Sequence, residues 1–425
     1  MSRDHGLIRL RARTAARETG LTGVPASPAR GRLTDALAAS PLGILGETRP
    51  SGNELGFYIH MPFCEARCHF CSFNTAPFDQ AALGRYLVAA DREIRLLGAL
   101  PWAGAVTLVS IFIGGGTPSL LHPDDVAALL AVLRGEFRVA GDVEVTLECN
   151  PESVSVQTFA GYRAAGVNRF SLGVQALDDG VLTRLGRRHG AADARAAFEA
   201  ARASGADNVS VDLMYGLPGV DTAAWAGTVG QVLDWRPDHL SAYGLTLDAG
   251  SLWGSAGAPE LPTEDVVIEQ YWALARAARV HGLEHYEISN YARPGFRSRH
   301  NLIYWQAAEY LACGPGACGF LGDVRYSNHK PVPRYVAALD TGALPVETWE
   351  RLTPRQRLAE RLILGLRTAD GVPRAWLEQR LLDDPRLGGL VADWEQAKLV
   401  RADAERVTLT ESGFLLSDAL FVELL

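Results

Sequence analysis

Three cysteines, Cys64, Cys68 and Cys71, crowd into eight residues of the sequence. Six cysteines in 425 residues are too few for a disulfide framework, so this clustering indicates a metal site. Spacings of three residues and then two let one loop place three thiolates around a single iron–sulfur cube. Three ligands leave the fourth iron open to an exchangeable ligand, and chemistry at a cluster requires such an open position.

A structural zinc site is the alternative interpretation of these cysteines. Structural zinc sites usually have four ligands in two pairs, and this sequence offers no second pair nearby. His69 is a fourth donor in principle, but its place between Cys68 and Cys71 makes binding to the same ion geometrically awkward. Three unrelated buried cysteines fit the spacing less well still. The pattern therefore favours a [4Fe-4S] cluster.

The shortage of lysine excludes other kinds of chemistry. Of the 41 basic residues only Lys330 and Lys398 are lysines, so residues 1–329 contain none. A P-loop needs a lysine after its glycines, and pyridoxal or aldolase chemistry needs a lysine amine for its Schiff base. We therefore expect none of these reaction classes.

Glycines and polar side chains end several of the apolar runs in the sequence. The run Gly-Gly-Gly-Thr at 114–117 suits the close approach of main-chain groups to a ligand. Glu148 and Gln175 end two further runs, and Asp212 lies inside a third. A carboxylate in a buried strand is costly unless it is paired or bound to a ligand. Arg187 is the expected counter-charge for Asp212, either in a structural pair or around a ligand.

Strands alternate with helices over the first two thirds of the chain, which predicts an α/β fold with a parallel sheet. Six units are too few for a closed eight-fold barrel and favour an open partial (β/α)6 barrel, with the polar residues above at its C-terminal mouth. The predicted strands are Gly56–Met61, Val106–Ile113, Val143–Leu147, Arg169–Val174, Val209–Met214 and His239–Leu245. The predicted helices are 79–100, 123–138, 155–165, 191–204, 221–234 and 263–281.

We expect four segments in the chain. Residues 1–55 are rich in Arg, Ala, Gly and Pro and predict a flexible or loosely docked extension, residues 56–290 the barrel, and residues 291–330 a connecting region over its mouth. Residues 331–425 predict a small helical, winged-helix-like domain with helices at 353–367, 373–382 and 389–399 and a strand at 407–410.

The cysteine motif, with an aromatic residue before its last cysteine, resembles the signature of the radical S-adenosylmethionine (SAM) superfamily. Tyr-x-His-x-Pro-Phe-Cys at 58–64 and Gly-Gly-Gly-Thr-Pro-Ser at 114–119 resemble the branch that contains oxygen-independent coproporphyrinogen III dehydrogenases and HemW-type haem chaperones. The same branch contains class C radical SAM methyltransferases and cyclopropanases. The resemblance covers about residues 56–425.

The resemblance implies a [4Fe-4S] cluster on Cys64, Cys68 and Cys71 and two SAM molecules, one of which the reduced cluster cleaves to a 5′-deoxyadenosyl radical. Contacts to the cleaved SAM are implied for Tyr58, Gly115 and Glu148. Contacts to a second SAM are implied for Phe70, Gly116, Thr117, Gln175, Arg187, Asp212 and Thr246.

Sequence details then suggest a place within the branch. The coproporphyrinogen dehydrogenases carry a further cysteine where this chain has Phe73, which argues against porphyrinogen decarboxylation. The run His-Asn-x-x-Tyr-Trp at 300–305 resembles a motif of the haem chaperones in which the histidine is a haem ligand. A His300 that is hydrogen-bonded within an aromatic loop is the alternative.

Two departures from the chaperone pattern favour a different activity. Ser72 stands where an aspartate is usual, and Cys318 where a histidine is usual. We therefore expect methyl or methylene transfer from the second SAM to an sp2 carbon of an aromatic natural product, with Cys318 and Tyr58 as candidate catalytic residues. A HemW-type chaperone binding haem, SAM and the cluster is the alternative, and a zinc-stabilised protein is a third.

The composition limits the partners and the location. A net charge of −8 gives no reason to expect nucleic acid, and the longest apolar runs are far shorter than the roughly 20 residues that cross a bilayer. We expect a cytoplasmic monomer whose partners are a small aromatic substrate or haem, and an external one-electron donor such as flavodoxin or ferredoxin.

Overall fold

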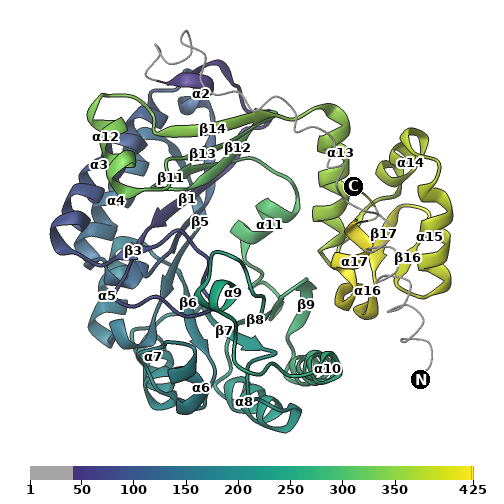
Figure 1. The fold of residues 1–425 in the computed structure, drawn as a ribbon. Helices are drawn as coiled ribbons and strands as arrows, with labels where there is room; N and C mark the ends of the chain where they lie inside the picture. Colours follow the sequence, from purple (N-terminus) through teal and green to yellow (C-terminus); the bar gives the residue numbers. More distant parts are fainter. Residues whose placement is uncertain (1–41, 423, 425) are drawn as a thin grey trace.

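The computed structural model describes residues 42–422 and 424, so residues 1–41 of the predicted extension at 1–55 lie outside them. Their main feature is a twelve-stranded sheet with the order β14-β13-β12-β11-β1-β4-β5-β6-β7-β8-β10-β9, curved as a partial barrel (Figure 1). Helices cover the outer face of the sheet, and a second small body stands beside it.

Six of the parallel strands form the centre of this sheet, and each is followed along the chain by a main helix that packs outside. The predicted α/β partial barrel is therefore confirmed. The strands are β1 (Glu54–Met61), β4 (Thr107–Gly115), β5 (Arg138–Cys149), β6 (Arg169–Gln175), β7 (Val209–Tyr215) and β8 (His239–Gly244). The main helices are α3 (Gln80–Gly98), α4 (Pro123–Glu136), α5 (Val156–Ala165), α7 (Ala191–Ala203), α8 (Thr222–Asp234) and α10 (Glu264–Val280).

Alternation along the central strands gives the barrel an apolar outside and a polar inside. On β5, Val145 and Leu147 are buried in the main hydrophobic core. Side chains of the opposite parity, Thr146 and Glu148, point to the other face, because successive residues of a strand alternate between faces. Polar groups inside a barrel are costly without partners, so this polar interior needs either hydrogen bonds or a ligand.

The region after β8 extends the sheet from both sides, so the prediction that residues 291–330 lie over the mouth is wrong. Short strands fold back into pairs that the sequence pattern did not reveal: β9 (Glu284–Glu287), β10 (Asn290–Ala292), β11 (Tyr310–Cys313), β12 (Cys318–Leu321), β13 (Val324–Asn328) and β14 (Val346–Arg351). Between β10 and β11, α11 (Arg299–Trp305) packs inside the barrel, where the space beside Gly56 is filled by Ile303 and His300.

Two predicted boundaries are also wrong. The helix α12 (Val332–Asp340) packs on α3 through the Tyr86 and Tyr335 rings, and β14 joins the large sheet, so both belong to the barrel rather than to a domain starting at 331. At the other end, α2 (Gly43–Glu47) places Ile44 and Leu45 in the main core. Because both side chains are buried there, residues 42–55 are not loosely docked.

The C-terminal body begins at α13 (Pro354–Leu366) and has its own apolar core, centred on Leu362 and Trp394. Its helices surround a small antiparallel sheet with the order β15-β17-β16, formed by Val372–Pro373, Arg406–Leu409 and Val400–Ala402. The other helices are α14 (Arg374–Asp383), α15 (Leu387–Gln396), α16 (Glu411–Leu415) and α17 (Ser417–Val422). In the part of the chain that the structure describes, no helix has the length and apolar character to span a bilayer.

Candidate functional site

The three clustered cysteines lie on a loop that directly follows β1. Two short parallel strands bracket the loop, β2 (Phe63–Cys64) and β3 (Ala76–Pro77). All three cysteines are half-buried, and the main-chain amide of Cys71 donates to the carbonyl of Cys68 at 3.2 Å. Burial raises the pKa of the Cys64 thiol to about 11, and a bound metal would favour its thiolate form.

The donor set fits a cluster better than a zinc ion. Among residues 42–422 and 424, no three His, Cys, Asp or Glu side chains converge closely enough to hold one metal ion. Zn–S bonds of about 2.3 Å in a tetrahedron would bring sulfurs within about 3.8 Å of one another. Thiolates that bind separate irons of a cube stand farther apart. His69 is engaged elsewhere, with Nδ1 2.8 Å from the carbonyl of Arg184.

The loop between β8 and α9 (Leu252–Ala256) holds the cysteine loop in place. Arg67 donates to the carbonyls of Gly250 at 2.8 Å and Cys71 at 3.2 Å. Ser72 donates to the Asp248 carboxylate at 2.7 Å. Gly250 and Asp248 lie 183 and 176 positions from their partners Arg67 and Ser72, and no local pattern indicates these two contacts. Ser72 is thus part of the support of the cysteine loop.

The glycine run at 114–117 packs directly on the cysteine loop. The amide of Gly116 donates to the Met61 carbonyl at 2.7 Å, and the amide of Thr117 donates to the Phe63 carbonyl at 2.9 Å. A Cβ at Gly116 would stand 2.6 Å from the Phe63 carbonyl oxygen. Gly115 has a φ of 114°, a conformation that glycine favours. The glycines therefore serve the contact between two loops.

Glu148 and Asp212 are the two carboxylates inside the mouth. Burial raises the pKa of Glu148 to about 7. The amide of Gly115 donates to this carboxylate at 3.0 Å and acts in the opposite direction, lowering the pKa. Burial also raises the pKa of Asp212, although hydrogen bonds from serines act to lower it. Ser171 donates to both Asp212 oxygens, at 2.9 and 3.0 Å. The expected Asp212–Arg187 pair is absent from these contacts, because the serines satisfy the carboxylate.

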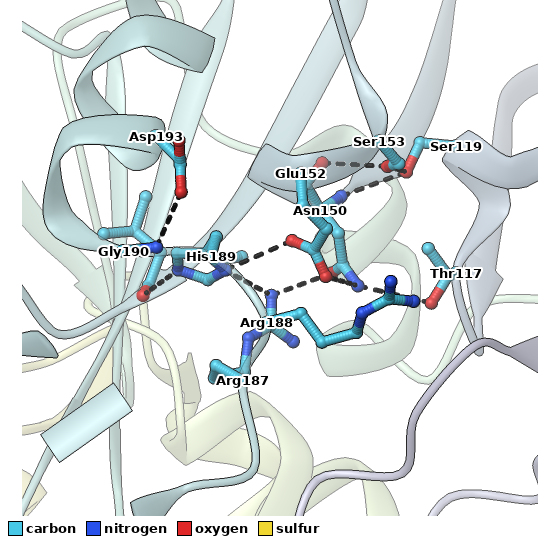
Figure 2. Close-up of polar contacts among 12 residues, drawn as sticks. Thr117, Ser119, Asn150, Glu152, Ser153, Arg187, Arg188, His189, Gly190 and Asp193 are labelled. Atoms are coloured by element: carbon cyan, nitrogen blue, oxygen red, sulfur yellow. Dashed lines mark hydrogen bonds and ion pairs between the residues drawn. The ribbon is translucent and has the colours of Figure 1, made fainter. Parts of the chain in front are cut away.

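Arg187 lies instead beside the cysteine loop. Its guanidinium donates to Cys68 Sγ at 3.4 Å, to Asn150 Oδ1 at 3.0 Å and to the Gly173 carbonyl at 2.8 Å. Its buried Nε has no hydrogen-bond partner among the described residues. Figure 2 shows Arg187 directed at Asn150, which also contacts Thr117. Thr117 in turn donates to Cys64 Sγ at 3.5 Å. A fixed positive charge thus stands next to one cluster ligand.

The remaining residues predicted to contact SAM lie around the same rim. Gln175 ends β6 with a φ of 67°, which is uncommon outside glycine and redirects the chain at the mouth. Phe70 packs on the apolar cluster that includes Met214. Thr246 is exposed just past β8, with only a long contact of 3.4 Å to the Gly244 carbonyl. Tyr58 contacts His60 Nδ1 at 2.9 Å, and His60 Nε2 contacts the Asn74 carbonyl at 2.8 Å.

His300 lies inside the barrel, where it is 1% exposed. Its Nδ1 is 2.8 Å from Ser110 Oγ and its Nε2 is 2.7 Å from the Tyr304 hydroxyl. Burial lowers its pKa to about 3, so the ring is neutral. Both ring nitrogens are buried and hydrogen-bonded, which fits the alternative of a hydrogen-bonded histidine, and haem ligation by His300 stays a prediction.

Cys318 is the exposed cysteine, at the start of β12 beyond the loop 314–317. This loop contacts the cysteine loop through Asn74, whose amide donates to the Pro315 carbonyl at 2.8 Å. Cys149 and Cys313 are buried in the core, as packing thiols are expected to be.

The sequence analysis missed two residues of the site, Asn74 and Arg169. Arg169 is 2% exposed and lies inside the barrel. A charged residue beginning an apolar strand was the available signal for Arg169.

Comparison with known proteins places this geometry in a family. The family model described as the radical SAM superfamily matches residues 58–230, and the HemN C-terminal domain model matches residues 352–416. The fold resembles coproporphyrinogen III oxidase (HemN) from Escherichia coli, with a TM-score of 0.77, 23% identity and 92% of each chain covered.

Curated relatives are similar over most of their length. A protein named heme chaperone HemW from Mycobacterium tuberculosis is 36% identical over 91% of this chain and 98% of its own length. The Bacillus subtilis protein of the same name is 32% identical over 86% of this chain and 97% of its own. A Bos taurus protein named radical S-adenosyl methionine domain-containing protein 1, mitochondrial, is 36% identical over 87% and 83%. The chain therefore belongs to the HemW family, in the HemN/HemW branch of the radical SAM superfamily.

Proposed function

We propose that this protein is a haem-binding chaperone that carries a [4Fe-4S] cluster and binds SAM. The observation that supports this most is the similarity to proteins named heme chaperone HemW along nine-tenths of the chain. The expected methyl or methylene transfer finds no support in the comparisons. Ser72 stands where an aspartate is usual and was one reason for expecting that transfer. Its hydroxyl donates to the carboxylate of Asp248. We also propose that the protein is a cytoplasmic monomer that accepts electrons from flavodoxin or ferredoxin.

The contacts at the mouth support a separate role for each group of residues in this proposal. Cys64, Cys68 and Cys71 would hold three irons and leave the fourth open to SAM. When bound, the cluster supplies the electron that cleaves SAM. The carboxylate of Glu148 lies where it can accept a hydrogen bond or attract the positive charges of SAM. Arg187 places its charge beside Cys68, where it offsets the negative charge of the thiolates.

Haem binding and transfer by the full-length protein test the proposal. After anaerobic reconstitution of the cluster, titration with ferric haem should produce a Soret band that saturates at one haem per chain. The loaded protein should then pass haem to an apo-haemoprotein faster than buffer-dissolved haem does. Absence of a saturable band would overturn the proposal. Transfer of label from methyl-labelled SAM to an aromatic acceptor would instead support the methyltransferase hypothesis.

The raised pKa of Glu148 predicts a pH dependence of SAM binding. With a pKa of about 7, Glu148 is neutral below pH 7 and charged above it. SAM carries a positive sulfonium, so its affinity should rise from pH 6 to pH 8, by up to about tenfold per pH unit below the pKa. The amine of SAM would also lose a proton if it bound the open iron, and that loss would add to the pH dependence in both proteins. Equilibrium dialysis should show a smaller slope for Glu148→Gln, and equal slopes would contradict the prediction.

The position of Arg187 predicts an effect on the reduction potential of the cluster. Arg187→Gln removes a positive charge that contacts Cys68, so the more negative reduced cluster loses stabilisation. We expect the potential to fall by about 60 mV or more, a tenfold change in the one-electron equilibrium. Arg188→Gln is the matched control, because Arg188 pairs with Glu65 at the surface. Dye-mediated titration followed by electron paramagnetic resonance measures the potential of each variant. Equal potentials in Arg187→Gln and the wild type would contradict the prediction.

A further inference from the structure

A cavity of about 580 Å³ lies between the barrel and the C-terminal body, away from the cysteine loop. Residues of α11, β11, β12 and β13 line one side of it, and residues of α13 and α17 line the other. In Figure 1 α11 and α13 face one another across this junction. Ligand pockets typically span about 300–1,000 Å³, so the cavity has the size of a small-molecule site.

The walls of the cavity are mainly apolar. Leu364 and Phe421 contribute from the C-terminal body and Phe320 from the sheet. Tyr304 and Tyr310 add an aromatic pair with ring centroids 4.6 Å apart and planes at 75°. Such walls suit a large apolar ring system, because aromatic and aliphatic side chains gain most from burying apolar surface.

Two of the arginines that line the cavity have no carboxylate partner among the described residues. Arg325 pairs with Glu350 and Glu360, and Arg367 pairs with Asp418. Arg357 and Arg361 make no ion pair and no side-chain hydrogen bond in residues 42–422 and 424, and Arg361 only stacks on Trp376 at 5.6 Å. They are half-buried and one helical turn apart on α13, so their charges repel.

We propose that this cavity binds haem, with the haem carboxylates on Arg357 and Arg361 and the macrocycle against the apolar walls. This inference rests on the proposed function and gives it a site. An apolar ring with two carboxylates matches both features of the cavity, since guanidinium groups bind carboxylates in bidentate fashion. His300, the residue expected to bind haem, is buried behind the cavity and does not line it.

The motif at 300–305 acquires a different role in this arrangement. Its histidine and tyrosine are four residues apart and therefore share one face of α11. Tyr304 lines the cavity, while its hydroxyl contacts His300 Nε2 at 2.7 Å, and His300 contacts Ser110 on β4. His300 is thus a positioning residue for Tyr304. The aromatic wall of the haem cavity is hydrogen-bonded to the interior of the SAM barrel through this chain.

Haem titration of a double variant tests the site. In Arg357→Gln/Arg361→Gln the Kd for ferric haem should rise about 10- to 100-fold, because two charge-assisted hydrogen bonds are lost. The substitution also removes a repulsion, so folding should be intact, which circular dichroism and thermal unfolding check. The matched control is Arg355→Gln, an exposed arginine on the same helix outside the cavity. It should leave the Kd unchanged.

Titration with a second ligand distinguishes an error in the proposed haem site from an error in the proposed haem-binding function. Haem dimethyl ester has no carboxylates, so it should bind the wild type and the double variant with similar Kd values. If the wild-type protein binds no haem, the proposed function is overturned. If the wild type binds haem and the double variant binds it equally well, haem lies elsewhere and this inference is wrong. A loss of affinity that is equal for haem and its ester would also overturn the carboxylate contacts.

Discussion

Serine in place of Cys68 leaves the protein without its iron–sulfur cluster. Three thiolates are the minimum that anchors a cube with one open iron, and a hydroxyl neither ionises nor binds iron as a thiolate does. Iron in the anaerobically reconstituted protein should fall from about four per chain to background, and reductive cleavage of SAM should fall by more than about 100-fold. Iron assay, absorption near 400 nm and deoxyadenosine release measure the result.

The other cysteines of the chain provide the matched control for this loss. Cys313 is buried at 0% exposure, with its thiol 3.8 Å from the Ala90 carbonyl and facing the helix layer. Cys313→Ser should keep the full iron content, even where it costs some stability. Cluster retention in Cys68→Ser, or equal loss of iron in both variants, would mean that the cysteine loop is not the cluster site.

Alanine at Glu93 should destabilise the fold by about 3–5 kcal/mol. Glu93 lies on α3 with its side chain fully buried, and it accepts from the Gly314 amide at 2.8 Å, Asn328 Nδ2 at 2.6 Å and the Tyr335 hydroxyl at 2.6 Å. Alanine would leave three donors buried without a partner, each costing roughly 1–3 kcal/mol. Urea unfolding measures the difference. Asp91→Ala, which breaks a surface pair with Arg95, should cost less than about 1 kcal/mol.

Glu93 also predicts how stability changes with pH. Burial raises its pKa from 4.5 to about 7, although the three hydrogen bonds act to lower it. The folded protein therefore keeps a proton that the unfolded chain releases between pH 4.5 and pH 7. The stability from this group is complete below pH 4.5 and is lost as the pH rises through 7. Glu93→Gln should flatten that part of the profile, and an unchanged profile would contradict the assignment.

Local periodicity was sufficient to predict the central fold. The predicted helices at 79–100 and 263–281 correspond to α3 and α10, since amphipathic helices of this length carry a strong repeat. The strands β9 to β13 have three to five residues, too few for an alternation to be detected. The assignment of α12 to the C-terminal body failed because a helix does not reveal in its sequence which core it joins.

The site was predictable only where its chemistry is local in sequence. Cys64, Cys68 and Cys71 share one loop, and their spacing alone indicated the cluster. The partner of Asp212 was predicted wrongly, because three serines donate hydrogen bonds to this carboxylate in place of the expected arginine. Serines in a strand do not indicate such a role in the sequence. Glu93 was missed for a related reason: its donors lie more than 200 residues away in the sequence.

The pairing of β1 with β11 sets an order for biosynthesis. Gly56 pairs with Ser110 on one side and with Tyr310 on the other, so β1 has an unpaired edge until the chain has grown past residue 313. Such distant pairing closes slowly and exposes an edge to other nascent chains. The cysteine loop follows that edge strand directly, and the loop 314–317 that contacts it emerges later still. We therefore expect iron to be loaded after translation, once the barrel edge is closed.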